Sequence, residues 1–96
     1  WVDLDDIIRL EAESNYTHVY LKGKKKMMIA KTLKSFEDQL SNTMFCRIHS
    51  AHLINLNEIE KYIKGDGGIV VLKDGANIPV SRANKTELLT KLNLYL

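Results

Sequence analysis

Cys46, His49 and His52 lie three positions apart and are the residues that could together bind a metal ion or perform nucleophilic catalysis. A structural zinc site takes four ligands, commonly in two separated pairs, and the chain has a single cysteine and only one further histidine. A cysteine nucleophile with a histidine base also needs a group that orients the base, and the sequence supplies none. We therefore predict no metal, no cofactor and no catalytic residue, and expect Cys46 to be a small core residue.

Two other patterns are incomplete versions of ligand-binding motifs. Asp3, Asp5 and Asp6 lack the glycine and the distal glutamate of a calcium-binding loop. The glycine-rich segment 65–68 lacks the Gly-Lys-Ser/Thr of a phosphate-binding loop. Neither pattern indicates an enzyme. The single cysteine excludes an internal disulfide and favours the reducing cytoplasm.

Polar side chains gather at three other places in the chain, namely 14–18, 47–50 and 81–85. Each segment combines cations or a histidine with small hydroxyl or amide side chains, which is the mixture that proteins use to hold phosphates and to read base edges. The third segment also opens a predicted helix, whose N-terminus favours an anion. Turns and helix caps are polar for structural reasons as well, so each segment alone leaves both interpretations open.

The elements that must position these segments are mainly strands. Alternation of apolar and polar residues, with turn residues between the runs, predicts a mainly β fold of about seven or eight strands. The predicted strands are 7–13, 16–21, 25–30, 44–48, 51–54, 59–63, 69–72 and 78–80. The β-branched run 69–72 predicts a central strand, whereas Pro79 fits only an edge strand or a bulge.

Two short helices are predicted from their caps and their apolar spacing. Thr32 caps the first, whose buried face would consist of Leu33, Phe36 and Leu40. Ser81 caps the second, whose buried face would consist of Leu88, Leu89 and Leu92. Between the last two predicted strands, Asp74-Gly75 predicts a tight hairpin turn with positive φ at both central positions.

Charge is unevenly distributed along the chain, although the formal net charge is only +2. Residues 1–16 carry five acidic groups and one basic group, whereas residues 17–34 carry six lysines and no acidic group. Residues 35–60 are net negative and residues 61–96 are net positive. Such segregation lets one face of a domain meet a polyanion such as nucleic acid. Lysines on a solvated edge strand that must not aggregate are the structural alternative.

The length of 96 residues predicts one domain, with an ordered core that we expect over about 6–92. No apolar run approaches the ~18 residues of a membrane span. The acidic start is not a signal peptide. Because the chain does not begin with methionine, we expect it to be a piece of a longer protein.

Several motifs occur in an order that resembles one family. They are Glu11-x-x-Ser14-Asn15-Tyr16, Lys31-Thr32-Leu33-Lys34-x-Phe36-Glu37, Phe45-x-Arg47-Ile48-His49 with Leu53-Ile54-Asn55, and Asp74-Gly75 with Pro79-Val80-Ser81-Arg82. Together they resemble the LytTR family of bacterial DNA-binding domains over about residues 6–92. The last two blocks carry most of the resemblance, because they occur together at the family's spacing.

The resemblance implies an elongated, mainly antiparallel β fold with one or two short helices. It also implies a transcriptional output domain behind the receiver domain of a two-component response regulator, of which this chain would be the C-terminal part. Family members insert loops into successive major grooves and commonly bind paired direct repeats as dimers. We therefore expect sequence-specific binding of double-stranded DNA in the bacterial cytoplasm, with no catalysis and no membrane partner.

Position by position, the resemblance assigns base contacts to Thr17, His18, Ser50 and Arg82. Arg82 is the strongest candidate, because a bidentate arginine–guanine contact contributes ~1–3 kcal/mol of discrimination. The residues expected to hold phosphates are Asn15, Tyr16, Arg47, His49, Ala51 through its backbone N–H, Asn84 and Lys85. For Arg47 and His49, bracing the loop internally is an equal alternative.

Ser50, Ala51 and His52 stand where many family members carry a basic residue, a serine and an aromatic residue. One cation and one hydroxyl are thus missing from the second loop, which predicts weaker backbone contact there or a different preferred base. The alternative function is a β-rich protein–protein interaction module that uses exposed strand edges and binds no nucleic acid.

Overall fold

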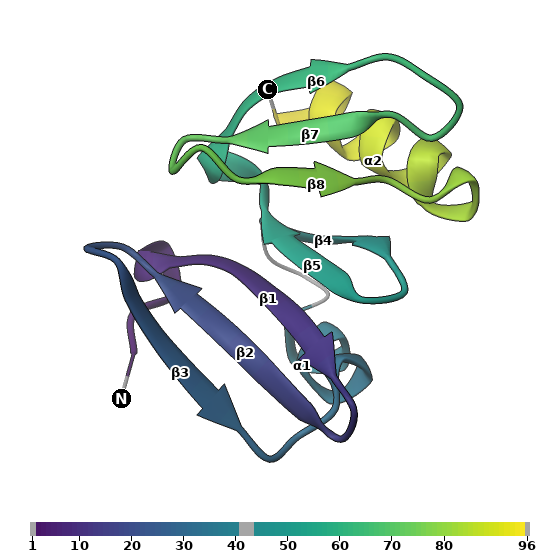
Figure 1. Cartoon of the computed structure of the whole chain (residues 1–96). Coiled ribbons are helices and arrows are strands. Elements are labelled where there is room, and N and C mark those ends of the chain that lie inside the picture. Colours follow the sequence, from purple (N-terminus) through teal and green to yellow (C-terminus); the bar gives the residue numbers. More distant parts are fainter. Residues whose placement is uncertain (1, 41–43, 96) are drawn as a thin grey trace.

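The computed structural model describes residues 2–40 and 44–95, which form two antiparallel β-sheets (Figure 1). The strands of the first sheet are β1 (Ile7–Glu13), β2 (Tyr16–Leu21), β3 (Lys25–Ile29), β4 (Phe45–His49) and β5 (His52–Asn55). Their order across the sheet is β3-β2-β1-β5-β4. The second sheet has the order β6-β7-β8 and consists of β6 (Ile59–Ile63), β7 (Ile69–Leu72) and β8 (Asn77–Pro79). The predicted mainly β fold is confirmed.

The helices pack on different parts of these sheets. The elements are α1 (Leu33–Leu40), α2 (Arg82–Tyr95) and the short 3-10 turns η1 (Leu4–Asp6) and η2 (Leu56–Glu58). As predicted, Thr32 caps α1, because its hydroxyl accepts a hydrogen bond from Ser35 N–H at 3.2 Å. Ser81 directly precedes α2 as predicted, although its hydroxyl donates to the Asn84 side chain. Neither α1 nor α2, the α-helices of the described residues, has the length and apolar composition that a membrane span requires.

Two hydrophobic cores lie on opposite faces of the β4–β5 pair. Cys46 and Ile54 belong to a core shared with the second sheet and with α2, whereas Phe45 and Leu53 belong to a core covered by α1. Successive side chains of a strand point to opposite faces, so this one short hairpin supports both cores. Cys46 is fully buried, as predicted, and burial raises the pKa of its thiol to about 11. The predicted stripe of α2 is buried at Leu88.

The β7–β8 turn differs from the prediction. Gly75 N–H donates to Leu72 O at 2.9 Å, and Leu72 N–H donates to Ala76 O at 2.9 Å. Three residues, 73–75, therefore lie between the hydrogen-bonded residues Leu72 and Ala76, and among them only Gly75 has a positive φ, at 91°. A type I turn followed by a left-handed glycine has this pattern, so the prediction of a positive φ at Asp74 was wrong. The predicted positions of β7, in the centre of its sheet, and of Pro79, on an edge strand, are confirmed.

Candidate nucleic-acid interface

The first two polar segments leave the same end of the first sheet. Near the end of β1, Glu11 pairs with His18 of β2 and with His52 of β5. This register places the β1–β2 turn at 14–15 beside the β4–β5 turn at 50–51. Both turns lie along the right-hand side of the molecule in Figure 1.

The third polar segment is held beside the second by backbone hydrogen bonds. Ser81 N–H donates to Ile48 O of β4 at 2.9 Å, and Val80 N–H donates to Gly68 O at 2.9 Å. A glycine is required at Gly67, because a Cβ at this position would overlap with the carbonyl oxygen of Val80. The start of α2 thereby continues the line of turns along one side of the molecule (Figure 1).

The β1–β2 turn exposes some predicted contact residues and buries others. Asn15 and Tyr16 have exposed side chains. Thr17 is fully buried, and its hydroxyl donates to Lys31 O at 2.8 Å. The Thr17 side chain therefore joins this turn to the segment before α1 and has no surface for the expected base contact.

All three histidines of the chain lie in one row across the first sheet. The row runs from His18 through Glu11 and His52 to His49, as the register of the four strands requires. His18 is buried, with Nε2 2.9 Å from Glu13 Oε1, which leaves its ring little surface for the expected base contact. This hydrogen bond lowers the pKa of Glu13. Burial lowers the pKa of His52, although attraction to Glu11, 3.6 Å away, opposes the shift.

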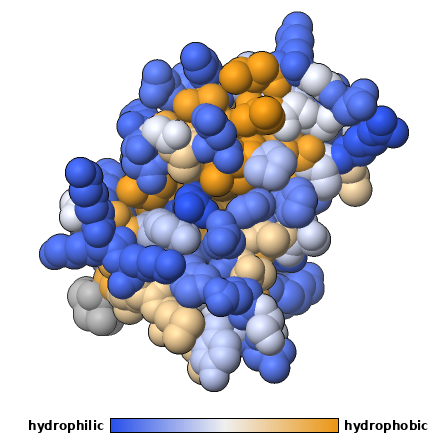
Figure 2. All heavy atoms as spheres, viewed as in Figure 1, coloured by the Kyte–Doolittle hydropathy of each residue, from blue (hydrophilic) through white to orange (hydrophobic). Residues whose placement is uncertain are grey.

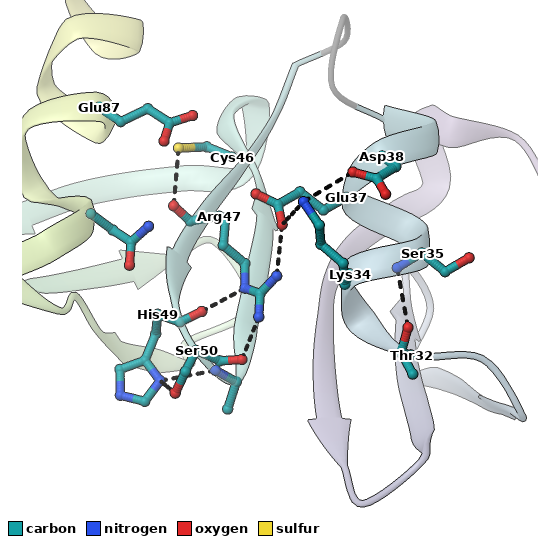
Figure 3. A network of polar contacts seen from close by, with 12 residues as sticks. Thr32, Lys34, Ser35, Glu37, Asp38, Cys46, Arg47, His49, Ser50 and Glu87 are labelled. Atoms are coloured by element: carbon teal, nitrogen blue, oxygen red, sulfur yellow. Dashed lines mark hydrogen bonds and ion pairs between the residues drawn. The ribbon is translucent and has the colours of Figure 1, made fainter.

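Arg47 braces the β4–β5 turn from within (Figure 3). Its Nε donates to His49 O at 2.8 Å and its Nη2 donates to Ser50 O at 2.6 Å. Its Nη1 donates to Glu37 Oε1 of α1 at 2.8 Å. Only 18% of the side chain is exposed, so these contacts favour the bracing role over a phosphate contact.

His49 has a similar internal role in the same turn. Its Nδ1 accepts a hydrogen bond from Ala51 N–H at 3.1 Å, and Ser50 Oγ lies 3.4 Å from the same nitrogen (Figure 3). The Ala51 N–H that was expected to hold a phosphate is therefore occupied within the turn. Ser50 is exposed, so its hydroxyl is the side-chain group that this turn offers to a ligand.

Arg82 extends from the start of α2. Its side chain is 79% exposed and lies 3.2 Å from the equally exposed carboxylate of Asp66. Such surface ion pairs contribute little, so Asp66 competes only weakly with a stronger ligand for the guanidinium. Asn84 and Lys85 follow in the first turn of the helix, and both are half-buried. Arg82 is thus exposed, like Ser50, whereas Thr17 and His18 are buried.

Lys31 is a basic residue of this edge that the sequence reasoning missed as a contact. It is exposed, and the hydrogen bond from Thr17 to its carbonyl places it behind the β1–β2 turn. Of the other lysines of residues 17–34, Lys34 lies in α1, and four lie at the opposite end of β2 and β3, namely Lys22, Lys24, Lys25 and Lys26. The sequence did contain a signal for this difference: antiparallel pairing of the predicted strands 16–21 and 25–30 places Lys31 at the opposite end from the lysines of the hairpin turn. We call the surface formed by 14–16, 49–51, 81–85 and Lys31 the polar edge.

The described residues contain no group of three or more His, Cys, Asp or Glu side chains that could hold a metal ion. Cys46 points into the core with Ile54, whereas the rings of His49 and His52 lie 5.2 Å apart in the histidine row. What the polar edge offers is a set of amide, hydroxyl and cationic groups from separate elements, which suits a polyanion.

Comparison with known proteins gives the family. The family model described as the LytTr DNA-binding domain matches residues 1–93. The chain belongs to the LytTR family of DNA-binding domains. A solved LytTr DNA-binding domain, from a Bacillus cereus protein assigned as a methyl-accepting/DNA response regulator, has the same fold with a TM-score of 0.85. The two share 22% sequence identity over 95% of this chain and 84% of that chain.

Two curated relatives of this LytTR domain come from Paraburkholderia xenovorans (strain LB400). They are the heme-containing CO-sensing transcriptional regulators RcoM 2 and RcoM 1, which are 27% and 26% identical to it over 90 residues. Each match covers 91% of this chain and 33% of the relative. The chain therefore spans a third of the length of these relatives.

Proposed function

We propose that this LytTR domain binds double-stranded DNA sequence-specifically, through loops of the polar edge that enter successive major grooves on one face of the duplex. The observation that carries the proposal is the convergence of three separate polar segments on one edge, with Arg82 79% exposed. Cations of the edge neutralise phosphates and release counterions, while exposed loop side chains read base edges. No catalysis is involved.

The dimensions of the domain support contact with more than one groove. Its longest extent is 33 Å, which is close to the ~34 Å of one turn of B-DNA. The side chains of the polar edge belong to turns of the first sheet and to the start of α2, so they are distributed along the molecule and are not confined to one loop.

Within this proposal the exposed and buried residues have different roles. Arg82 reads guanine through its O6 and N7 acceptors, and Ser50 makes a second base contact. Phosphates are held by Asn15, Tyr16, Lys31, Asn84 and Lys85. Arg47 and His49 position the second loop, and Thr17 and His18 position the first.

We also propose that the domain is the transcriptional output of a longer bacterial regulator that acts in the cytoplasm. The names of the relatives, which include transcriptional regulators and a response regulator, support this setting. A receiver domain ahead of residue 1 would promote dimerisation, and a dimer on direct repeats would bind more tightly through raised effective concentration.

Selection of bound duplexes from a random pool tests the proposal. The parent chain should enrich one recurring motif, and Arg82→Ala should lose the preference at a single base position. Lys24→Ala, at the opposite end of the sheet, is the control and should enrich the parent motif. Affinity should also fall by roughly a thousandfold between about 50 and about 200 mM salt, if about six phosphates are contacted. A flat salt response, or no enrichment, would overturn the proposal.

A further inference from the structure

A cleft of about 400 Å³ opens between the two sheets, at the end of the molecule opposite the polar edge. The β2–β3 hairpin forms one side and the β7–β8 turn approaches from the other. Its lining includes Ile8, Leu21, Lys24, Lys25, Lys26 and Asp74, and we call it the lysine cleft. In Figure 2, hydrophilic side chains project from this left-hand end beside hydrophobic atoms at the junction of the sheets.

The three lysines of the cleft form no ion pair within the part of the chain that the structure describes. Within the described residues, no carboxylate lies within 4.0 Å of the ammonium groups of Lys24, Lys25 or Lys26. Asp74 is the acidic residue of the lining, and its Oδ1 already accepts a hydrogen bond from Ala76 N–H at 3.0 Å. Three lysines and one aspartate give the lining a net positive charge, and Lys26 Nζ also lies 5.2 Å from the centroid of the Tyr20 ring.

The floor of the cleft is apolar. Ile8 belongs to the core shared with the second sheet, and Leu21 is half-buried against the core covered by α1. An inorganic phosphate would use only the lysines and leave this floor in contact with water. A ligand with carboxylates and one apolar side chain would use both the lysines and the floor.

The chain already places carboxylates beside the same hairpin. A neighbouring cavity is lined by Asp3 and Asp6 of the N-terminal segment together with Lys22 and Lys25. An acidic stretch of the chain's own polypeptide thus already lies beside this hairpin.

We propose that the lysine cleft docks an acidic peptide segment of a partner protein, with one apolar side chain of that segment packed against the apolar atoms of the lining. Lysine ammonium groups act as point charges toward its carboxylates. The contact is small, as is typical of transient encounters. The six residues of β2 span about 20 Å, which exceeds the ~8–10 Å Debye length, so DNA at one end and the peptide at the other do not compete.

Fluorescence anisotropy with a fluorescein-labelled oligoglutamate peptide that carries one central leucine tests the docking on the 96-residue chain. Lys24→Glu with Lys25→Glu should weaken binding by about tenfold or more, since two attractive pairs become repulsive. Lys61→Glu on the exposed side of β6 is the matched charge control and should change binding by less than about twofold. The same peptide without leucine should bind more weakly.

Four results would overturn the proposal. They are no binding of the peptide, an equal loss with Lys61→Glu, equal binding without the leucine, and displacement of the peptide by tripolyphosphate or a short duplex at lower concentration than by unlabelled peptide. After any of the first three results, the remaining explanation of the hairpin lysines is that they protect an edge strand from aggregation. The fourth result would show that the cleft binds phosphates in preference to an acidic peptide.

The proposal of peptide docking and the proposal of DNA binding can be disproved separately, because different variants test them. The variant with Lys24→Glu and Lys25→Glu should bind the selected duplex like the parent, and Arg82→Ala should bind the peptide like the parent. Loss of duplex binding by the first variant would overturn the separation of the two ends.

Discussion

The polar edge and the lysine cleft lie at opposite ends of the same strands, and they hold their polar groups in different ways. At the polar edge, Arg47 and His49 fix the β4–β5 turn through hydrogen bonds to its backbone. In the lysine cleft, flexible ammonium groups surround an apolar floor. A turn held in one conformation suits the presentation of side chains to base edges, whereas mobile cations suit any carboxylate that comes close. From this comparison we expect that the order of the turns, more than the density of charge, marks the surface that would read the DNA sequence under the proposed function.

The largest effect expected from this contrast is at Arg82. Arg82→Ala should lower affinity for the selected duplex by about 10- to 100-fold, the equivalent of a lost bidentate guanine contact, and lower affinity for random duplex much less. Lys24→Ala should leave both affinities unchanged. Titration by anisotropy at one fixed salt concentration measures all four values. If Lys24→Ala lost as much as Arg82→Ala, the two ends would not differ in the way proposed.

The bracing role of Arg47 predicts a loss of stability that a surface ion pair does not give. Arg47→Met keeps an apolar side chain of similar length but removes the donors to His49 O and to Glu37. The free energy of unfolding should fall by about 1–3 kcal/mol, because charged hydrogen bonds in a part-buried site are lost. Urea denaturation with an unchanged m-value measures this difference.

Lys34→Met is the matched control, since Lys34 lies 4.0 Å from the same carboxylate of Glu37 but is 71% exposed. Lys34→Met should lower the free energy of unfolding by less than about 1 kcal/mol. Equal stability of the Arg47 and Lys34 variants would show that the brace contributes no more than a surface pair.

Sequence patterns predicted most of the fold because its strands are short hairpins with local signals. Alternation predicted β1 and β2 with the bounds that the structure has, and the strand predicted at 59–63 has the bounds of β6. The prediction of a positive φ at Asp74 was wrong, because the dipeptide Asp74-Gly75 does not reveal that three residues lie between the paired residues Leu72 and Ala76. Cys46 was predicted as a core residue, since one cysteine without partners has no ligand role.

The candidate site was harder to predict, because proximity in sequence does not reveal which way a side chain points. Thr17 and Tyr16 are neighbours, yet one is fully buried and the other is 45% exposed. The internal use of Ala51 N–H depends on a ring two residues earlier in the chain. The hairpin of β2 and β3 distributes the lysines of residues 17–34 between two ends of the sheet, so the net charge of this segment did not identify a single binding surface.

Lys31 sharpens the comparison, because it belongs to the same lysine run as the cleft but lies at the polar edge. Lys31→Ala should weaken duplex binding a few-fold and reduce the slope of log affinity against log salt by about 1, as expected for one lost phosphate contact. Lys25→Ala should leave the slope unchanged. Anisotropy titrations at several salt concentrations measure both, and equal slopes for the two variants would remove Lys31 from the interface.

The smallest expected effect concerns the histidine row beneath the polar edge. Because burial lowers the pKa of His52 from its ordinary 6.5, the unfolded chain binds a proton at this side chain more readily than the folded chain does. The free energy of unfolding should therefore fall as the pH decreases through 6.5 toward the lowered folded pKa, and become independent of His52 below it. Glu11 limits the effect by attracting the charged ring, whereas His49 and Arg9 increase it.

His52→Gln removes the titrating ring and should reduce this loss of stability on acidification, measured by urea denaturation across the range. Lys24→Met, in the lysine cleft, should keep the pH dependence of the parent, because it leaves the row intact. An unchanged pH dependence in His52→Gln would assign the effect to other groups. A reduced one would place the pH-sensitive part of the sheet at the end that carries the polar edge, since the half-buried ring is held there by the same strand pairing that brings the polar turns together.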